Sequence, residues 1–288
     1  MKYQFIKDHQ DVFSARRICR ALKVSPSGYY RWVLRTPSQR DTENGKLLER
    51  ILVIHQETNK TYGSPRITES LRDEGFIVSR PRIARLMRKH GISATIRRKF
   101  RVTTDSDHDL AISPDLLNRN FTADQPGKVW TSDITYISIQ EGWLYLTVVE
   151  DLYNREIVGW AMSDGLSASE TTIPALIQAC CRRKPDPGLI FHSDRGIQYA
   201  CKDFRELLNN HQIIQSMSGR GNCFDNAVTE SFFGTFKKDL IYRRNLMTKR
   251  EARQEIFKHL EIVYNRTRKH STIGNVSPVQ FLSERQAA

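Results

Sequence analysis

Three acidic residues, Asp133, Asp194 and Glu230, have the types and settings that metal chemistry requires. Asp133 interrupts an apolar and threonine-rich stretch that predicts a strand, where an unpaired acid is costly to bury and aspartate is disfavoured. Asp194 ends the segment LIFHSD, at the carboxyl end of another expected strand, which is where open α/β sheets place ligands. Carboxylates bind Mg²⁺, and two such ions about 3.5 to 4 Å apart can clamp the attacking and leaving oxygens of a phosphodiester. We therefore expect the three acids to be catalytic and to bind metal.

Each acid also has an ordinary alternative role when it is considered alone. Asp133 can be an acid near a strand end, Asp194 a turn residue and Glu230 a solvated helix position. The ordered set of all three favours the catalytic interpretation. His192, close to Asp194, is a candidate for a catalytic base or a metal ligand. Its side chain lies on the same face as Asp194 only if the strand extends to residue 194, so we favour a structural role.

Glu230 is expected on a helix that runs from about residue 225 to residue 242. Seven residues of helix turn through about 700°, so Lys237 shares the face of Glu230, and Asn226 lies close by, one turn earlier. We assign Asn226 and Lys237 to DNA contact beside the catalytic acid. The preceding loop, residues 216–227, is either an ordinary connection or a mobile loop that shapes the DNA path. The face expected to pack on the sheet carries Thr229, Phe232, Phe233, Phe236 and Leu240.

The elements that must position these acids begin near residue 127. Three strand-like runs, WTSDITYISI, GWLYLTVVEDL and REIVGWAMS, predict an antiparallel meander. Helices and short strands then alternate. This is the order of a ribonuclease-H-like α/β domain with a mixed five-stranded sheet. The alternating segments are a helix over 168–182, a strand over 189–192, a helix over 202–209, a strand over 213–216 and long helices over 225–242 and 249–265.

The chain ahead of this core is expected to be all helical, which makes the whole an α+β multidomain protein. Residues 13–35 predict two helices joined by a turn at Lys23 to Ser25, a helix-turn-helix pattern. Residues 102–126 are acidic, contain proline and lack periodicity, which indicates a linker. The expected division is a helix-turn-helix-like segment (1–45), a basic helix-turn-helix domain (46–101), a linker (102–126), the catalytic core (127–245) and a C-terminal helical extension (246–288).

Positive charge is concentrated in the first third of the chain. The net charge is +13, and residues 1–101 hold 23 Lys and Arg against 9 Asp and Glu. The stretch 80–101 contains nine basic residues and no carboxylate. A run of charge is often only a solvated face, but a run of one sign in an otherwise balanced protein suits a polyanion, most simply nucleic acid.

A helix from about residue 80 to residue 90 is the best candidate to read DNA. Ser79 and Pro81 suit its start and Gly91 its end. An apolar stripe of Ile83, Leu86 and Met87 lies beside a basic stripe, as a recognition helix in the major groove requires. An ordinary solvated face is the alternative. The residues assigned to DNA contact are Arg80, Arg82, Arg85, Arg88 and Lys89.

Composition places the chain among folded proteins of the cytoplasm. Charged residues make up 27% and hydrophobic residues 39%, and no apolar run approaches the roughly 20 residues of a membrane span. The first residues lack the apolar stretch of a signal peptide. The five cysteines show no zinc-type spacing, so we expect them to be reduced and structural.

These motifs together resemble the transposases of two-frame bacterial insertion sequences. The resemblance is to the second-frame (OrfB) subunit of the IS-three type, a DDE transposase related to retroviral integrases. It covers nearly the whole chain. Asp194 and Glu230 are separated by 35 residues, as in the family's Asp, Asp, 35, Glu triad, and Lys237 matches its basic residue. The matching segments are 24–32, 61–67, 75–92, WTSDITYI (130–137), FHSDRGIQY (191–199), 218–237 and YNRTRKHSTIGNVSPVQF (264–281).

The resemblance implies a ribonuclease-H-like integrase catalytic core that depends on Mg²⁺ or Mn²⁺. It implies cleavage at the terminal inverted repeats of an insertion sequence, then strand transfer into target DNA. A homo-oligomer on DNA, a first-frame (OrfA) partner or fusion, and association with the nucleoid follow from it as well. Asp151 lies in EDLYNRE, which resembles a family segment, but the order of the triad leaves it a structural role. The zinc site of the integrases has no counterpart here.

Two other functions remain open at this stage. A DNA-binding protein with a relic catalytic domain would act as a repressor or architectural factor, and the intact triad argues against it. A ribonuclease H or junction resolvase would use the same fold and metals. The basic helical units and Lys237 favour a site-specific recombinase.

Overall fold

The computed structural model describes most of the chain. It covers residues 2–34, 36, 38–94, 110–219, 227–241 and 248–287. Asn226, the basic residues 97–101 and most of the loop ahead of Glu230 lie outside the described residues.

The first three helices form a small unit with its own core. They are α1 (Lys2–Asp8), α2 (Ala15–Ala21) and α3 (Pro26–Val33). The Ser25 side chain accepts a hydrogen bond from Gly28 N, and a proline at the first turn suits a helix start, so α3 begins as the sequence predicts. The core consists of Ile6, Ile18, Cys19 and Tyr29.

The second helical unit contains α4 (Gln39–Glu57), α5 (Ser64–Asp73) and α6 (Arg80–Lys89). Ser38 and Asp41 form a reciprocal capping box that fixes the start of α4. The boundary that we drew between residues 45 and 46 therefore falls inside a helix. Apolar side chains from all three helices share one core: Leu47, Ile51, Ile54, Tyr62, Ile67, Leu71, Val78, Ile83, Leu86 and Met87.

A five-stranded mixed sheet follows, as expected, in the order β3-β2-β1-β4-β5. Strands β1 (Val129–Ile139), β2 (Gly142–Asp151) and β3 (Ile157–Ser163) pair antiparallel. Strands β4 (Ile190–Ser193) and β5 (Ile214–Met217) continue the sheet in parallel from β1.

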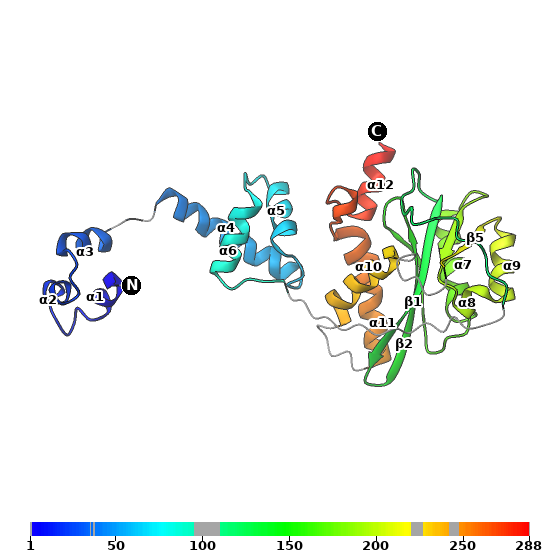
Figure 1. Cartoon of the computed structure of the whole chain (residues 1–288), viewed down its shortest axis with the longest axis horizontal. Coiled ribbons are helices and arrows are strands. Elements are labelled where there is room, and N and C mark those ends of the chain that lie inside the picture. The colour runs from blue at the N-terminus through cyan, green and yellow to red at the C-terminus, as the bar shows by residue number, and fades with distance from the viewer. Residues whose placement is uncertain are drawn as a thin grey trace.

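Helices cover both faces of the sheet (Figure 1). One face packs against α7 (Thr172–Arg183), α8 (Ile197–Ala200) and α9 (Lys202–Asn210) through a core that includes Trp130 and Phe191. The other face packs against α10 (Ala227–Phe236) and α11 (Lys249–Lys258). The last helix is α12 (Pro278–Gln286).

Both long C-terminal helices change their winding, which sequence periodicity did not predict. A π-helical turn, Lys237–Ile241, follows α10, and a second π-helical segment, His259–Thr267, follows α11. We had expected continuous α-helices over 225–242 and 249–265. In the first π-turn Asp239 forms an ion pair with Arg268, so the altered winding coincides with a long-range contact.

The segment that we expected to be a linker contacts the catalytic domain. Leu116 N donates a hydrogen bond of 2.9 Å to Ser216 Oγ of β5, and Ser113 Oγ donates one of 2.9 Å to Gln215 Oε1. Leu117 is buried in a cluster with Val129. From Ser113 onward the segment therefore covers the edge of the sheet.

Strand β3 and helix α7 approach each other closely at Gly159. A Cβ atom at this position would lie 2.3 Å from the carbonyl oxygen of Ala175 and 2.8 Å from Ala179 Cβ. Glycine is thus required by the spacing of helix and strand. Within the described part of the chain, no helix combines the length and apolar character that crossing a membrane demands.

Candidate active site

Asp133 lies on β1, and Asp194 directly follows the end of the neighbouring strand β4. Strands β1 and β4 run parallel with Thr131 opposite His192, and each acid lies two residues further along. Because side chains alternate and neighbouring strands lie about 4.8 Å apart, the two carboxylates extend from one face at the carboxyl end of β4. This is the position that the sequence suggested for a ligand site.

The electrostatics of Asp133 reflect that proximity. Its Oδ1 accepts a hydrogen bond of 2.7 Å from Ile134 N. Burial raises the pKa of Asp133 well above its usual range, and the charge of Asp194 raises it further. Two carboxylates that repel each other in this way need a cation before both can ionise.

Asp194 is held by the turn that follows β4. Its Oδ1 accepts a hydrogen bond of 2.9 Å from Gly196 N. Ser193 Oγ donates a bond of 2.9 Å to the carbonyl oxygen of Asp194. Both bonds fix the direction of the residue at the end of the strand.

Helix α10 places Glu230 beside the two aspartates. Thr229 Oγ1 donates a hydrogen bond of 3.0 Å to Thr131 Oγ1, and both side chains are fully buried. This contact anchors the helix on β1, two residues before Asp133. Glu230, the next residue, is exposed, and its charge contributes to the raised pKa of Asp133.

The donor set fits a hard divalent cation such as Mg²⁺. The mutual repulsion of Asp133 and Asp194, together with the nearby Glu230, creates the negative field that such an ion neutralises. Among the described residues, no three His, Cys, Asp or Glu side chains stand close enough to hold one ion as placed. The structure thus pairs the two aspartates and leaves Glu230 at their side.

Lys237 faces the same site from the end of α10. Its side chain is half-buried; burial lowers its pKa, and the charge of Asp133 opposes that shift. Lys237 in turn lowers the pKa of Asp133. The shared face that helical geometry predicted for Glu230 and Lys237 is consistent with this mutual influence, whereas Asn226 lies outside the described residues.

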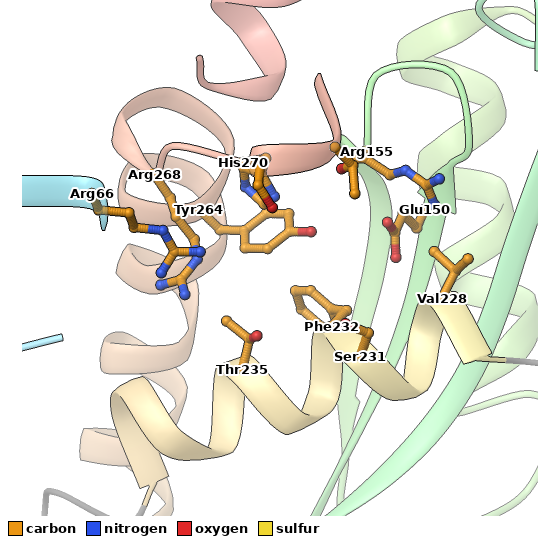
Figure 2. A pocket seen from close by; sticks show the side chains of 12 residues that line it. Arg66, Glu150, Arg155, Val228, Ser231, Phe232, Thr235, Tyr264, Arg268 and His270 are labelled. Atoms are coloured by element: carbon orange, nitrogen blue, oxygen red, sulfur yellow. The ribbon is translucent and has the colours of Figure 1, made fainter. Parts of the chain in front are cut away.

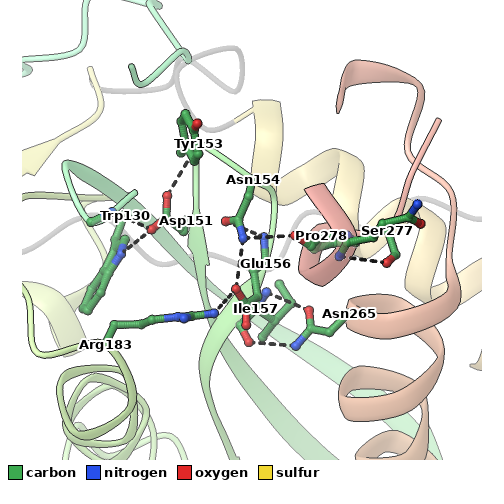
Figure 3. Close-up of polar contacts among 12 residues, drawn as sticks. Trp130, Asp151, Tyr153, Asn154, Glu156, Ile157, Arg183, Asn265, Ser277 and Pro278 are labelled. Atoms are coloured by element: carbon green, nitrogen blue, oxygen red, sulfur yellow. Dashed lines mark hydrogen bonds and ion pairs between the residues drawn. The ribbon is translucent and has the colours of Figure 1, made fainter. Parts of the chain in front are cut away.

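His192 and Asp151 have structural surroundings. His192 is fully buried, and its Nδ1 lies 2.9 Å from Ser216 Oγ. Asp151 accepts hydrogen bonds from Gly127 N at 2.8 Å, Trp130 Nε1 at 3.1 Å and Tyr153 N at 2.9 Å (Figure 3). These contacts agree with the structural role that we expect for Asp151.

A polar network ties the C-terminal segment to the sheet (Figure 3). The Asn265 side chain accepts a hydrogen bond from Ile157 N and donates one to Ile157 O, both 3.0 Å long. Asn154 Nδ2 donates a bond of 3.3 Å to Pro278 O. Sequence reasoning did not identify these residues, whose partners are more than a hundred positions away.

The basic face of α6 divides into two parts. Arg82 is half-buried and donates hydrogen bonds of 3.0 Å to Asn44 Oδ1 and 3.0 Å to Glu43 Oε2, which fix α6 on α4. The other basic side chains are exposed: Arg80, Arg85, Arg88 and Lys89.

A hollow of about 260 Å³ lies beside α10, lined by residues other than the three acids (Figure 2). The resemblance to the family included the segments 61–67 and 264–281 but implied no role for their arginines. The spacing of those arginines along the chain gives no signal that they meet. The lining comprises Arg66, Glu150, Arg155, Val228, Ser231, Phe232, Thr235, Tyr264, Arg268, His270, Ser271 and Thr272.

Comparison with known proteins matches three regions of the chain. The model of an integrase core domain matches residues 123–223, and a second integrase core domain model matches residues 211–278. The model of an HTH-like domain matches residues 42–100.

Similar proteins extend over almost the full length. "Insertion element IS600 uncharacterized 31 kDa protein" of Shigella sonnei is 43% identical over 92% of this chain and 97% of its own length. "Transposase InsF for insertion sequence IS3A" of Escherichia coli (strain K12) is 38% identical over 98% of both chains. A solved structure, the HTLV-2 integrase catalytic core domain in complex with magnesium, has a TM-score of 0.43 and 18% identity over 55% of this chain and 98% of its own. With these full-length relatives and its integrase core, the chain belongs to the IS3-type family of insertion-sequence transposases, which are DDE polynucleotidyl transferases.

Proposed function

We propose that this protein cuts DNA at the ends of an insertion sequence and joins them to target DNA, with Asp133, Asp194 and Glu230 as its catalytic and metal-binding residues. The observation that supports the proposal is the parallel pairing of β1 with β4, which brings Asp133 and the residue that follows β4, Asp194, to one end of the sheet next to the helix of Glu230. Both sequence and setting suit Mg²⁺ or Mn²⁺.

The protein groups have separate tasks in this proposal. Asp133 and Asp194 would hold the ions between them, and Glu230 would complete the ligand set from α10. When bound, two such ions activate the attacking water or 3′ hydroxyl and neutralise the leaving oxygen. Lys237, on the same face, would contact a phosphate next to the scissile bond.

DNA recognition would come chiefly from the second helical unit. Arg80, Arg85, Arg88 and Lys89 are exposed on α6 and can reach a groove, while Arg82 would keep the helix on α4. We further propose a homo-oligomer on DNA that bridges the two element ends, and a first-frame protein as partner or fusion. The site of action would be the nucleoid in the cytoplasm.

A nicking assay on element-end DNA tests the catalytic assignment. Asp194→Asn should abolish Mg²⁺-dependent nicking yet leave end binding nearly intact, because removal of an acid cannot weaken phosphate attraction. Asp186→Asn, at an exposed acid in the loop before β4, is the matched control and should nick normally.

Two results would contradict the proposal, and a third would make the variant uninformative. If Asp194→Asn lost both DNA binding and nicking, the variant would be misfolded or its binding would depend on metal. Tight binding by the wild type without nicking in Mg²⁺ or Mn²⁺ would indicate a DNA-binding protein. Nicking without preference for element ends would indicate a nuclease of the ribonuclease H type.

A further inference from the structure

The hollow behind α10 is built from two domains. Arg66 enters it from α5 of the second helical unit, and the other lining residues come from the catalytic domain (Figure 2). Two contacts dock the units beside it: Lys269 N donates a hydrogen bond of 3.2 Å to Tyr62 Oη, and Lys269 Nζ forms an ion pair with Asp73. The pocket therefore exists in this form only while the units are docked.

The pocket carries an excess of positive charge. Arg66, Arg155 and Arg268 line it, and Asp239 pairs with Arg268. Glu150 is the acid of the lining, and burial raises its pKa to about 8, so it is mostly uncharged at neutral pH. Arg155 Nη2 donates a hydrogen bond of 3.0 Å to the carbonyl oxygen of Phe121. Arg66 lies over the Tyr62 ring, 5.4 Å from its centroid, and has no hydrogen-bond or ion-pair partner among the residues that the structure describes. Three guanidinium groups thus share one small volume in which Asp239 neutralises the charge of Arg268.

Several polar atoms at this pocket are buried without a partner. Within the described chain these include Arg268 Nε, which is a donor, and the Arg268 side chain is only 4% exposed. A buried donor left unpaired costs about 1 to 3 kcal/mol, so native proteins rarely keep one without a ligand or water to bind it. His270 Nε2 is also buried without a partner, but burial lowers the pKa of His270 to about 3, so this ring is neutral and we assign it no contact with an anion. Hydroxyl groups of Ser231, Thr235 and Thr272 complete a polar lining.

We propose that this pocket binds a phosphate group of the DNA backbone, held by Arg66 of the helix-turn-helix unit and by Arg155 and Arg268 of the catalytic domain. Guanidinium groups match the geometry of phosphate oxygens, and several can bind one phosphate. The inference rests on the proposed function for the identity of the ligand. It adds a contact that joins the two domains across the DNA.

The pocket is distinct from the catalytic site. On α10, Val228, Ser231 and Thr235 face the pocket, whereas Glu230 is turned by about 130° from the middle of that face. The same helix therefore lies between the phosphate site and the catalytic acids. The proposed phosphate would be bound away from the scissile bond.

The test is the salt dependence of DNA binding by the full chain, measured in EDTA so that no catalysis takes part. The logarithm of the binding constant K decreases linearly with the logarithm of the salt concentration, and loss of one phosphate contact should make this slope less steep by about 0.9. If the contact contributes nothing at 1 M salt, a change of about 0.9 in the slope corresponds to about an eightfold loss of affinity at 0.1 M salt. Arg66→Gln should show this loss, and Arg66→Lys should restore most of the slope.

Two further variants control for folding and for general charge. Thr272→Glu places a carboxylate in the lining at an exposed residue, so it should reproduce the loss even if Arg66→Gln disturbs docking. Arg205→Gln removes an exposed charge from α9, on the far face of the sheet, and should bind like the wild type. If Arg66→Gln and Thr272→Glu instead match Arg205→Gln, the proposal is wrong.

Free phosphate is the other source of the same group. We expect inorganic phosphate, added at constant ionic strength, to change the melting temperatures of the wild type and of Arg66→Gln by the same small amount. Selective stabilisation of the wild type, with equal DNA salt slopes for both, would assign the pocket to a free anion and overturn the DNA assignment. Nicking by the wild type is measured in a separate assay. Failure of the catalytic proposal can therefore be told apart from failure of the pocket proposal.

Discussion

Glu150→Gln should stabilise the catalytic domain at alkaline pH. Glu150 is 2% exposed on β2, and its Oε2 has no hydrogen-bond partner among the described residues. Burial raises the pKa of its carboxyl from 4.5 to about 8, although Arg155 draws it down. Glutamine keeps the shape of the protonated acid and cannot ionise.

The magnitude follows from proton linkage. Between pH 4.5 and about 8 the folded protein keeps a proton that the unfolded chain releases. The stability that the raised pKa provides is therefore fully present below pH 4.5. It decreases as the pH rises from 4.5 to about 8, and the free energy of unfolding changes no further above that pH through this group. At about 1.4 kcal/mol per unit, the wild type should lose about 2 to 3 kcal/mol relative to Glu150→Gln between pH 6 and pH 8.5.

Urea unfolding at both pH values measures this difference. Tryptophan fluorescence reports mainly on the catalytic domain, because Trp130, Trp143 and Trp160 lie there and only Trp32 lies in the first helical unit. The free energy of unfolding of the wild type should decrease relative to the variant as pH rises. A constant difference between the two proteins at pH 6 and pH 8.5 would refute the raised pKa.

Three further perturbations have defined outcomes. Gly159→Ala should cost about 1 to 3 kcal/mol of stability, seen as a lower urea midpoint, since its Cβ would lie 2.3 Å from the Ala175 oxygen. Thr229→Val should cost about 1 to 3 kcal/mol in the same assay, because the Thr131 hydroxyl loses its donor in a buried place. Arg85→Ala should cost about 1 to 3 kcal/mol for element-end DNA alone if Arg85 reads a guanine, whereas equal weakening on scrambled DNA would assign it to phosphate.

Local sequence patterns predicted the elements that carry the acids. Asp133 is conspicuous because an unpaired acid is costly to bury in an apolar strand. Asp194 is conspicuous because it ends a short apolar segment before a glycine turn. Their meeting follows from the parallel pairing of β1 and β4. The start of α4 at the Ser38 and Asp41 capping box was not predicted, and the boundary between residues 45 and 46 therefore falls inside this helix.

The phosphate pocket could not be predicted in this way. Its arginines are Arg66 on α5, Arg155 in the turn after β2 and Arg268 after the second π-helix. The residues next to each of them in the sequence form no pattern that indicates a binding site. They meet because Tyr62 and Asp73 dock one unit against Lys269. Such docking depends on the tertiary arrangement of whole domains, whereas periodicity reports only on the face of one element.

Helix α10 connects the two sites, and this connection has a mechanical consequence. The Thr229 to Thr131 hydrogen bond holds its first turn on β1, while Glu230 remains exposed beside the paired aspartates. Completing the metal site therefore requires the Glu230 carboxylate to approach Asp133. A phosphate bound by Arg66 and Arg268 would restrain the opposite side of the same helix. DNA that occupies the pocket would thus dock the helix-turn-helix unit and steady the helix that supplies the third acid.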